Sequence, residues 1–483
     1  MKRTSLRSLL LAALLLVSAP AAQGTPSPDL RTTLRIRLLE QLTPQSAVIQ
    51  AGPHGIAVTT QPGGQPLFHL GPGQSMEVTR RETRIVVEGA YGRHTAPDLF
   101  LEPLGPGDTT LRVAGTSRSY AGSLHLSVDS RGATLRFVNH VPLEDYVASV
   151  VASEYGLPDL EGSKAMAVIA RTYGLKVIGS TDDSYDHVDH TASQVYRGSR
   201  AVTATARRAA EETRGEVLTH NGRLIEAVYS SSSGGHTANN EDVWSANPHP
   251  YLRGRKDPWD RESKYHRWEF SVAESTLHGA LTSALGREVT GVSVAARSAD
   301  GRASSIEIET AGGSSRTLQA DEFRRIIRAS LGESALRSTK FEVHRRRGNY
   351  QFEGGGFGHG VGLSQWGAHG MAKAGKSYRD ILDFYYTDVR LERRATGSSP
   401  TPAAGLLASL ESSSPSGPGG NRLAGRAMPG TRTAASKPAT AAVAERSVGR
   451  ETSAQHAGSE TGTAAWAPVR ERAERSSGRR RGW

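Results

Sequence analysis

Apolar and polar residues alternate along the first part of the chain. Between about Asp29 and His140 the period is two, as in the run LRIRL at residues 34–38, and glycine and proline interrupt the alternation at short intervals. Since successive side chains of a strand point to opposite faces, this pattern predicts a series of short β-strands.

The apolar spacing changes to three and four residues between Pro142 and Ile178, which is typical of helices. Pro142 suits a first helical position, where its missing N–H would have no partner, and Gly156 with Pro158 suits the end of the same helix. We expect a second helix over about 161–177 and a third over about 199–213.

Asn221-Gly222 separates two strand-like runs, 216–220 and 223–229. Both turn residues tolerate positive φ, so the pair predicts a β-hairpin. The run SSSSGGH at 230–236 follows, and it is too small and polar to form part of a hydrophobic core. We expect a loop that approaches a ligand with backbone and hydroxyl donors. Mixed strand and helix patterns then lead to a glycine-rich stretch at 354–368.

The two ends of the chain differ from the rest. A basic start, an apolar run over 9–17 and small residues at 19–22 predict a secretory signal peptide over residues 1–24. The apolar run is about half of the ~20 residues that a spanning helix needs, so we expect no transmembrane anchor. Residues 395–483 are mainly Ser, Ala, Gly, Pro, Thr and Arg, which predicts a disordered basic tail.

Charge and cysteine content exclude some classes of function. The net charge is +11, but the tail alone holds six more basic than acidic side chains, so the rest is only mildly basic. A nucleic-acid-binding protein would carry a basic patch with stacking aromatics on a folded face, so we expect no nucleic-acid partner. The chain has no cysteine, which excludes disulfides, a lipidated cysteine and thiolate metal ligands.

One carboxylate stands out on the predicted first helix. The apolar face of this helix runs through Tyr146 and Val150, and the next position at the same spacing is Glu154. Burial beside this face would raise the pKa of Glu154, as a general acid that works near neutral pH requires. The alternative is that the helix ends at Glu154 and its carboxylate reaches water.

Two cations lie seven residues apart on the predicted second helix. Lys164 and Arg171 would be separated by two turns, on the order of 10 Å, along one face. They could hold an anionic substrate near Glu154 or form an ordinary solvated face. Alanines at 165, 167 and 170 favour the first interpretation because they indicate close packing of this helix.

Other chemistries have weaker support. The run DHVDH at 186–190 offers metal ligands, but we favour an exposed polar loop and expect no metal site and no cofactor. The serine run lacks a Gly-x-Ser-x-Gly elbow, and the glycine-rich stretch lacks the Gly-Lys-Ser/Thr of a P-loop. Its glycines permit tight turns that would bring His359, Ser364 and Gln365 to a cleft.

A set of short motifs, in order along the chain, carries a family resemblance. They are VPLEDYV at 141–147 with ASE at 152–154, KA at 164–165 with ARTY at 170–173, QVY at 194–196, TRG at 213–215, YSSSSGGHT at 229–237, EDVW at 241–244, PYL at 250–252 and GHGVGLSQWGA at 358–368. In these motifs the chain resembles the stage II sporulation protein D family, over about residues 110–391.

The resemblance implies an activity and a site. Enzymes of that family are lytic transglycosylases acting on peptidoglycan. In such enzymes one Glu protonates the glycosidic oxygen and then, as carboxylate, helps the 6-hydroxyl of the same sugar attack C1. Glu154 corresponds to this residue. The substrate-binding positions would be Lys164, Arg171, Tyr229, Ser231, Ser233, His236, Glu241, Asp242, His359, Ser364 and Gln365.

The chain departs from the family pattern in three places. It has Glu154-Tyr155-Gly156 where Glu-Met-Pro is usual, and Phe357 where Trp usually precedes Gly-His-Gly. Some members carry a zinc site of His and Cys near the position of His187, and we expect none here because cysteine is absent.

We therefore expect an α+β fold in which the helices that carry Glu154 pack on antiparallel β-sheet. The expected divisions are a signal peptide (1–24), a β-rich region (29–140), a peptidoglycan-acting domain (141–394) and the tail (395–483). The β-rich region is either a small separate domain or a flank of the next one. The expected function is an exported bacterial lytic transglycosylase in the periplasm or cell wall. The alternative is a non-catalytic protein that holds glycan and stimulates a cell-wall amidase.

Overall fold

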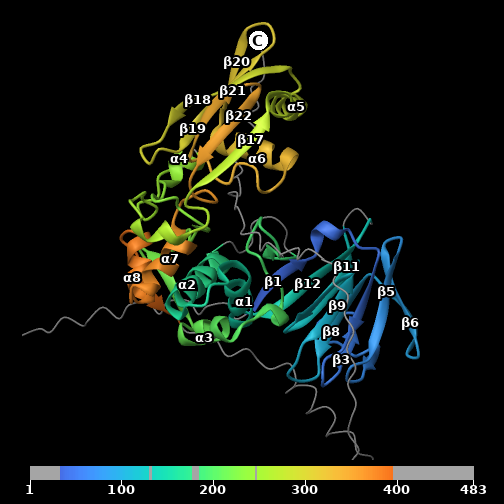
Figure 1. Ribbon diagram of the computed structural model, residues 1–483. Helices are drawn as coiled ribbons and strands as arrows, with labels where there is room; N and C mark the ends of the chain where they lie inside the picture. The colour runs from blue at the N-terminus through green and yellow to red at the C-terminus, as the bar shows by residue number, and fades with distance from the viewer. Residues whose placement is uncertain (1–32, 130–132, 177–183, 245–246, 395–483) are drawn as a thin grey trace, which may run out of the picture.

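A computed structural model describes residues 33–129, 133–176, 184–244 and 247–394 (Figure 1). The predicted signal peptide and the predicted tail lie outside these residues. The described part combines helices with mostly antiparallel sheets, so the expected mixture of helix and sheet is confirmed. No helix in these four ranges is both long enough and apolar enough to cross a membrane.

The described residues from Thr33 to Pro142 form twelve strands, and a series of short strands is what the period-two pattern predicts. They are β1 (Thr33–Leu38), β2 (Ser46–Gln50), β3 (Ile56–Thr59), β4 (Phe68–Leu70), β5 (Ser75–Arg81), β6 (Arg84–Gly89), β7 (Gly92–Ala96), β8 (Asp98–Pro103), β9 (Thr109–Val113), β10 (Thr116–Tyr120), β11 (Ser123–Val128) and β12 (Leu135–Pro142). With β13 (His187–Val188) they make one sheet in the order β13-β1-β12-β11-β8-β3-β4 and another in the order β10-β9-β2-β5-β6-β7.

The helices follow the last of these strands. They are α1 (Leu143–Val150), which continues as a π-turn (Val151–Tyr155), α2 (Leu160–Lys176), α3 (Ala204–Glu212), α4 (Asn240–Trp244), α7 (Gln365–Lys373) and α8 (Tyr378–Tyr385). Gly156 ends the first helical segment with a φ of 60°, as predicted. The third helix is shorter than predicted because Thr203 caps it by accepting a hydrogen bond from the Ala206 N–H.

Short strands precede or follow these helices along the chain. They are β14 (Glu216–His220), β15 (Arg223–Leu224), β16 (Tyr229–Ser230), β23 (Leu363–Ser364) and β24 (Arg390–Arg393). The predicted hairpin is confirmed, since β14 pairs with β15 across Asn221 and Gly222, whose φ angles are 50° and 73°.

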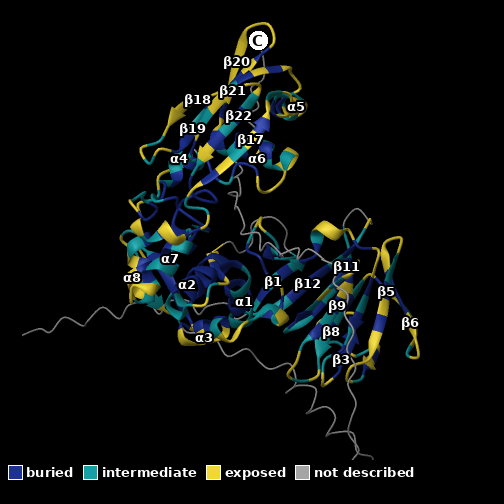
Figure 2. Cartoon of the chain, viewed as in Figure 1, coloured by how far each residue is buried: buried dark blue, intermediate teal, exposed yellow. Residues whose placement is uncertain are grey.

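The strands and helices share one hydrophobic core. Helix α2 is buried along nearly its whole length (Figure 2), and its alanines at 165, 167 and 170 are fully buried, as their small size predicts. A Cβ added at Gly174 of α2 would lie 3.2 Å from Leu34 of β1 and 3.0 Å from Tyr146 of α1. The N-terminal strands thus pack directly on the helices rather than forming a separate core.

A second core belongs to a unit inserted between α4 and β23. It contains β17 (Trp268–Ala273), α5 (Glu274–Leu285), β18 (Val289–Arg297), β19 (Ala303–Thr310), β20 (Ser314–Gln319), α6 (Ala320–Leu331), β21 (Phe341–Arg346) and β22 (Asn349–Gly354). Its strands form two three-stranded sheets, and Figure 1 shows the unit extending from the helical part.

Candidate active site

Glu154 lies in the π-turn that extends α1, and its side chain is buried, with 3% of the residue exposed. The Val195 N–H donates to Glu154 Oε1 at 2.7 Å. Burial raises the pKa of Glu154 to about 7, although the hydrogen bonds from Val195 and the Tyr229 hydroxyl and the charge of Arg197 act in the opposite direction. The predicted burial is confirmed, and the alternative of a carboxylate in open water is wrong.

A chain of hydrogen bonds fixes the direction of the bond between Tyr229 and Glu154. The Tyr146 hydroxyl donates to Gln194 Oε1 at 2.8 Å, and Gln194 Nε2 donates to the Tyr229 hydroxyl at 3.2 Å. Since Tyr229 accepts from Gln194, its own proton is available for the carboxyl of Glu154. This chain therefore presents a hydrogen-bond donor to the ionised form of Glu154.

Two residues of the glycine-rich stretch contact Tyr229. Tyr229 pairs with Leu363 in the parallel strands β16 and β23. The backbone of Tyr229 is also a hydrogen-bond partner of the buried His359 side chain, whose Nδ1 accepts from the Val361 N–H at 3.0 Å. Burial, with Arg324 and Arg302 nearby, lowers the pKa of His359 to about 3. His359 is therefore neutral at physiological pH and supports Tyr229 as an uncharged group.

Gln365 and Ser364 lie at the start of α7, where Gln365 contacts Glu154. Gln365 Nε2 donates to the backbone oxygen of Glu154 at 3.0 Å. Ser364 caps α7 by accepting from the Gly367 N–H at 3.1 Å, and its hydroxyl donates to Asp260 Oδ1 at 2.8 Å. Both side chains are buried, so Gln365 ties the start of α7 to the backbone of Glu154 and Ser364 ties it to Asp260.

The serine and glycine loop at 230–236 is buried over residues 230–234, which corrects the expectation of a loop unsuited to the interior. The reason is Asp260, whose carboxylate accepts hydrogen bonds from the Ser232 hydroxyl and from the backbone N–H groups of Ser233 and Gly234. Ser233 also donates its hydroxyl to Asp257 at 2.9 Å. Most polar groups of the loop are thus satisfied inside the protein, although the buried hydroxyl of Ser231 has no hydrogen-bond partner among the described residues. The backbone oxygen of Ser231 accepts from the Trp366 N–H.

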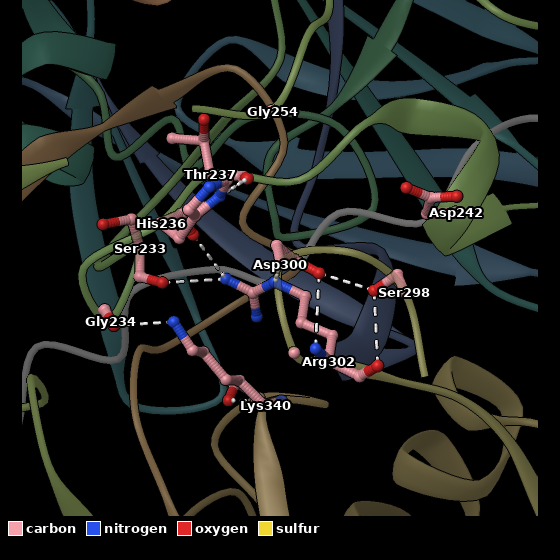
Figure 3. Close-up of polar contacts among 12 residues, drawn as sticks. Ser233, Gly234, His236, Thr237, Asp242, Gly254, Ser298, Asp300, Arg302 and Lys340 are labelled. Atoms are coloured by element: carbon pink, nitrogen blue, oxygen red, sulfur yellow. Dashed lines mark hydrogen bonds and ion pairs between the residues drawn. The ribbon is translucent and has the colours of Figure 1, made fainter. Parts of the chain in front are cut away.

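Two cations of the inserted unit bind the backbone of this loop (Figure 3). Arg302 Nη2 donates to the backbone oxygens of Ser233 at 2.8 Å and His236 at 3.3 Å, and Lys340 Nζ donates to that of Gly234 at 3.0 Å. Arg302 is buried and paired with Asp300. The loop therefore joins the two cores, and its carbonyl groups face cations of the protein itself.

Asp242 of the acidic pair at 241–242 stands apart from this group in Figure 3. Glu241 forms an ion pair with Arg253 at 2.6 Å, and Asp242 accepts from Asn239 at 2.8 Å. In the part of the chain that the structure describes, neither residue of this pair forms a hydrogen bond or an ion pair with Glu154. Its predicted part in substrate binding stays a prediction.

The two cations of α2 have protein partners. Arg171 is fully buried and forms a two-pronged ion pair with Glu144, and it also donates to the backbone oxygen of Glu216 at 3.0 Å. Lys164 pairs with Glu161 at 2.8 Å and Glu212 at 2.6 Å. Their predicted contact with substrate would require these pairs to open, so it too stays a prediction.

The run at 186–190 is largely buried, so the expectation of an exposed loop is wrong. Asp186 pairs with Arg35 and Asp189 with Arg118, both at 2.8 Å. These pairs tie the run to β1 and β10. Within the ranges that the structure describes, no three His, Asp or Glu side chains gather as metal ligands.

Sequence reasoning missed three residues that shape the site. Gln194 orients Tyr229, Asp260 organises the buried loop, and Arg197 is the charged side chain that acts on the pKa of Glu154. Gln194 and Arg197 lie in and directly after the QVY motif, so that motif was the available signal. Nothing local marks Asp260, which lies 27 residues beyond Ser233.

The fold and site define a mixed helix and sheet protein in which a buried glutamate is held by a tyrosine and a backbone amide. Residues 131–220 match the family described as stage II sporulation protein. Stage II sporulation protein D of Bacillus subtilis is 35% identical over 273 residues, which cover 53% of this chain and 75% of that protein. The chain belongs to the stage II sporulation protein D family.

Two further relatives extend this comparison. An uncharacterized protein of Brachyspira hyodysenteriae is 31% identical over 268 residues, 53% of this chain and 68% of that protein. The amidase enhancer of Bacillus subtilis is 31% identical over 274 residues, 48% of this chain but only 38% of that protein. Residues 256–362, which include the inserted unit, match a domain family of unknown function.

Proposed function

We propose that the protein is an exported lytic transglycosylase that cleaves the glycan strands of bacterial peptidoglycan, with Glu154 as its acid and base. The observation that carries the proposal is the buried carboxyl of Glu154, whose pKa of about 7 leaves a large protonated fraction near neutral pH. A general acid works best when its pKa lies near the working pH. Ordinary surface carboxylates would be ionised there.

The reaction needs one group in two protonation states. Protonated Glu154 donates its proton to the glycosidic oxygen as the bond between that oxygen and C1 of the muramyl sugar breaks. The resulting carboxylate takes the proton of the 6-hydroxyl of the same sugar, whose oxygen bonds to C1. The product is a 1,6-anhydro ring, no water is consumed, and Glu154 ends protonated again.

The surroundings of Glu154 suit both states. The Val195 N–H and the Tyr229 hydroxyl stabilise the carboxylate that exists between the two proton transfers, while burial stabilises the protonated form. Ordinary glycoside hydrolases use two carboxylates at a fixed separation. The charged side chain that acts on Glu154 is instead a cation, Arg197, which favours the mechanism with one carboxylate.

An amidase enhancer is the second candidate function, and the name of one relative from Bacillus subtilis favours it. Such a protein would hold glycan and stimulate a separate wall amidase without cleaving the strand. It would have no need of an acid whose pKa lies near 7. We give the transglycosylase precedence for this reason.

The test compares the purified protein with Glu154→Gln on purified peptidoglycan and on peptide-free glycan strands, with mass spectrometry of the soluble products. The proposal expects anhydro-muramyl ends from the wild type and none from the variant. A parallel reaction contains a cell-wall amidase. Stimulation of the amidase by both proteins, with no new glycan ends from either, would replace the transglycosylase by the enhancer.

A further inference from the structure

The segment that covers Glu154 is fixed at several points on both sides of one residue. Val195 donates its N–H to Glu154, and the Tyr196 hydroxyl donates to Asn139 Oδ1 at 2.7 Å. Further on, the backbone oxygen of Gly198 accepts from the Ser149 hydroxyl at 2.9 Å. A segment held in this way keeps the intervening residue in a defined place.

Gly198 adds a steric constraint to this segment. Its φ is 76°, and a Cβ there would lie 2.1 Å from the backbone oxygen of Ser119. The chain therefore passes close to β10 in a conformation that favours glycine. This fixed path limits the directions in which the side chain of the preceding residue, Arg197, can project.

Arg197 is the intervening residue, and its side chain is exposed while Gln194, Val195 and Tyr196 are buried. Among the residues that the structure describes, Arg197 takes part in no hydrogen bond and no ion pair. Two residues of extended chain span at most about 7 Å, and the charge of Arg197 lowers the pKa of Glu154, so the guanidinium lies within electrostatic range of that carboxyl. An exposed cation next to a buried acid is an arrangement for holding a charged ligand beside the reacting bond.

We infer that Arg197 is a substrate-binding residue that pairs with a carboxylate of the glycan strand close to the bond that is cleaved. This inference rests on the proposed function for the location of the substrate. The sugar rings of the strand are uncharged, so its anionic groups are carboxylates. They belong either to the lactyl group of the muramyl sugar, when no peptide is attached, or to an attached stem peptide. A planar guanidinium binds a carboxylate through two parallel hydrogen bonds.

Arg197 fits this task better than the cations of α2. Arg171 is buried and paired with Glu144, and Lys164 is paired with Glu161 and Glu212. If Arg171 or Lys164 bound a substrate carboxylate, its existing ion pairs would break. Arg197 has no such ion pair to break. Its guanidinium is therefore already available when substrate arrives.

The test measures binding, so that it does not depend on catalysis. Soluble fluorescent glycan fragments are titrated with Glu154→Gln and with the same variant carrying Arg197→Ala, and the dissociation constants are compared by anisotropy. Three ligands are used: peptide-free strands with free lactyl carboxylates, the same strands with the carboxylates converted to methylamides, and peptide-bearing strands. Arg200→Ala is the matched control, since Arg200 is exposed and lies three residues away in the same segment.

The expected result is a loss of about tenfold in affinity for the carboxylate-bearing strands on Arg197→Ala, as for removal of a charge-assisted pair. The methylamide strands bind both proteins equally, Arg197→Lys keeps part of the affinity, and Arg200→Ala changes nothing. The ligand that shows the loss, peptide-free or peptide-bearing, identifies the source of the carboxylate.

Equal affinity of parent and Arg197→Ala for every strand, or an equal loss on the methylamide strands, would overturn the inference. Absence of cleavage by the wild type would instead refute the proposed function and leave this binding result standing.

Discussion

Replacing Glu154 by Gln should make the free energy of unfolding fall less as the pH rises. Glu154 has a pKa of about 7 in the folded protein, against 4.5 for an unperturbed carboxyl. Each factor of ten in a protonation equilibrium corresponds to about 1.4 kcal/mol. Once the pH is above both pKa values, burial of the ionised Glu154 therefore lowers the free energy of unfolding by about 3 kcal/mol.

The sign follows from the raised pKa. The contribution of a protonated Glu154 to stability is fully present below about pH 4.5 and is lost as the pH rises through about 7, since burial disfavours the ionised form. Gln has nearly the same shape and does not titrate. The variant should thus gain stability relative to the wild type over this window, by about 2–3 kcal/mol between about pH 5 and about pH 8.

Urea unfolding of both proteins, followed by circular dichroism at the two pH values, measures this difference. Other titrating groups are common to the two proteins and cancel in the comparison. A pH-independent offset from new hydrogen bonds of Gln also cancels, because only the change with pH is used. A difference between variant and wild type that stays constant across the window would show that the carboxyl is not perturbed, and the reasoning about its proton would be wrong.

Two further variants test the surroundings of Glu154. Arg171→Ala should destabilise the protein by about 3–5 kcal/mol in urea unfolding, because it removes a fully buried side chain and leaves the partly buried Glu144 without its partner; a loss below about 1 kcal/mol would show that the pair is not structural. Tyr229→Phe removes a hydrogen bond that lowers the pKa of Glu154, so the fall of glycan cleavage at alkaline pH should move to higher pH. An unmoved or acid-shifted limb of the pH profile would contradict the hydrogen-bond direction derived from Gln194.

Local signals predicted the elements around the site. Gly156 ends the helix of Glu154, and Asn221-Gly222 forms the hairpin, because each depends on backbone conformations that a few neighbouring residues determine. The apolar stripe through Tyr146 and Val150 likewise predicted that Glu154 is buried, since a helix continues its own face.

Contacts between distant parts of the chain could not be predicted in the same way. The partner of Arg171 is Glu144, 27 residues earlier, and the groups that bury the serine loop come from Asp260 and Arg302. Their positions depend on how the two cores meet. Sequence pattern alone therefore predicted substrate-binding cations on α2 and a loop that approaches a ligand, whereas tertiary packing buries Arg171 and most of the loop.

The most direct test of Glu154 as acid and base is digestion of peptide-free glycan strands in water enriched in ¹⁸O, with mass spectrometry of the new ends. We expect 1,6-anhydro-muramyl ends that contain no ¹⁸O, because the 6-hydroxyl and not water attacks C1, and we expect no such ends with Glu154→Gln. Reducing ends that carry ¹⁸O, or the same anhydro ends from the variant, would contradict this role of Glu154.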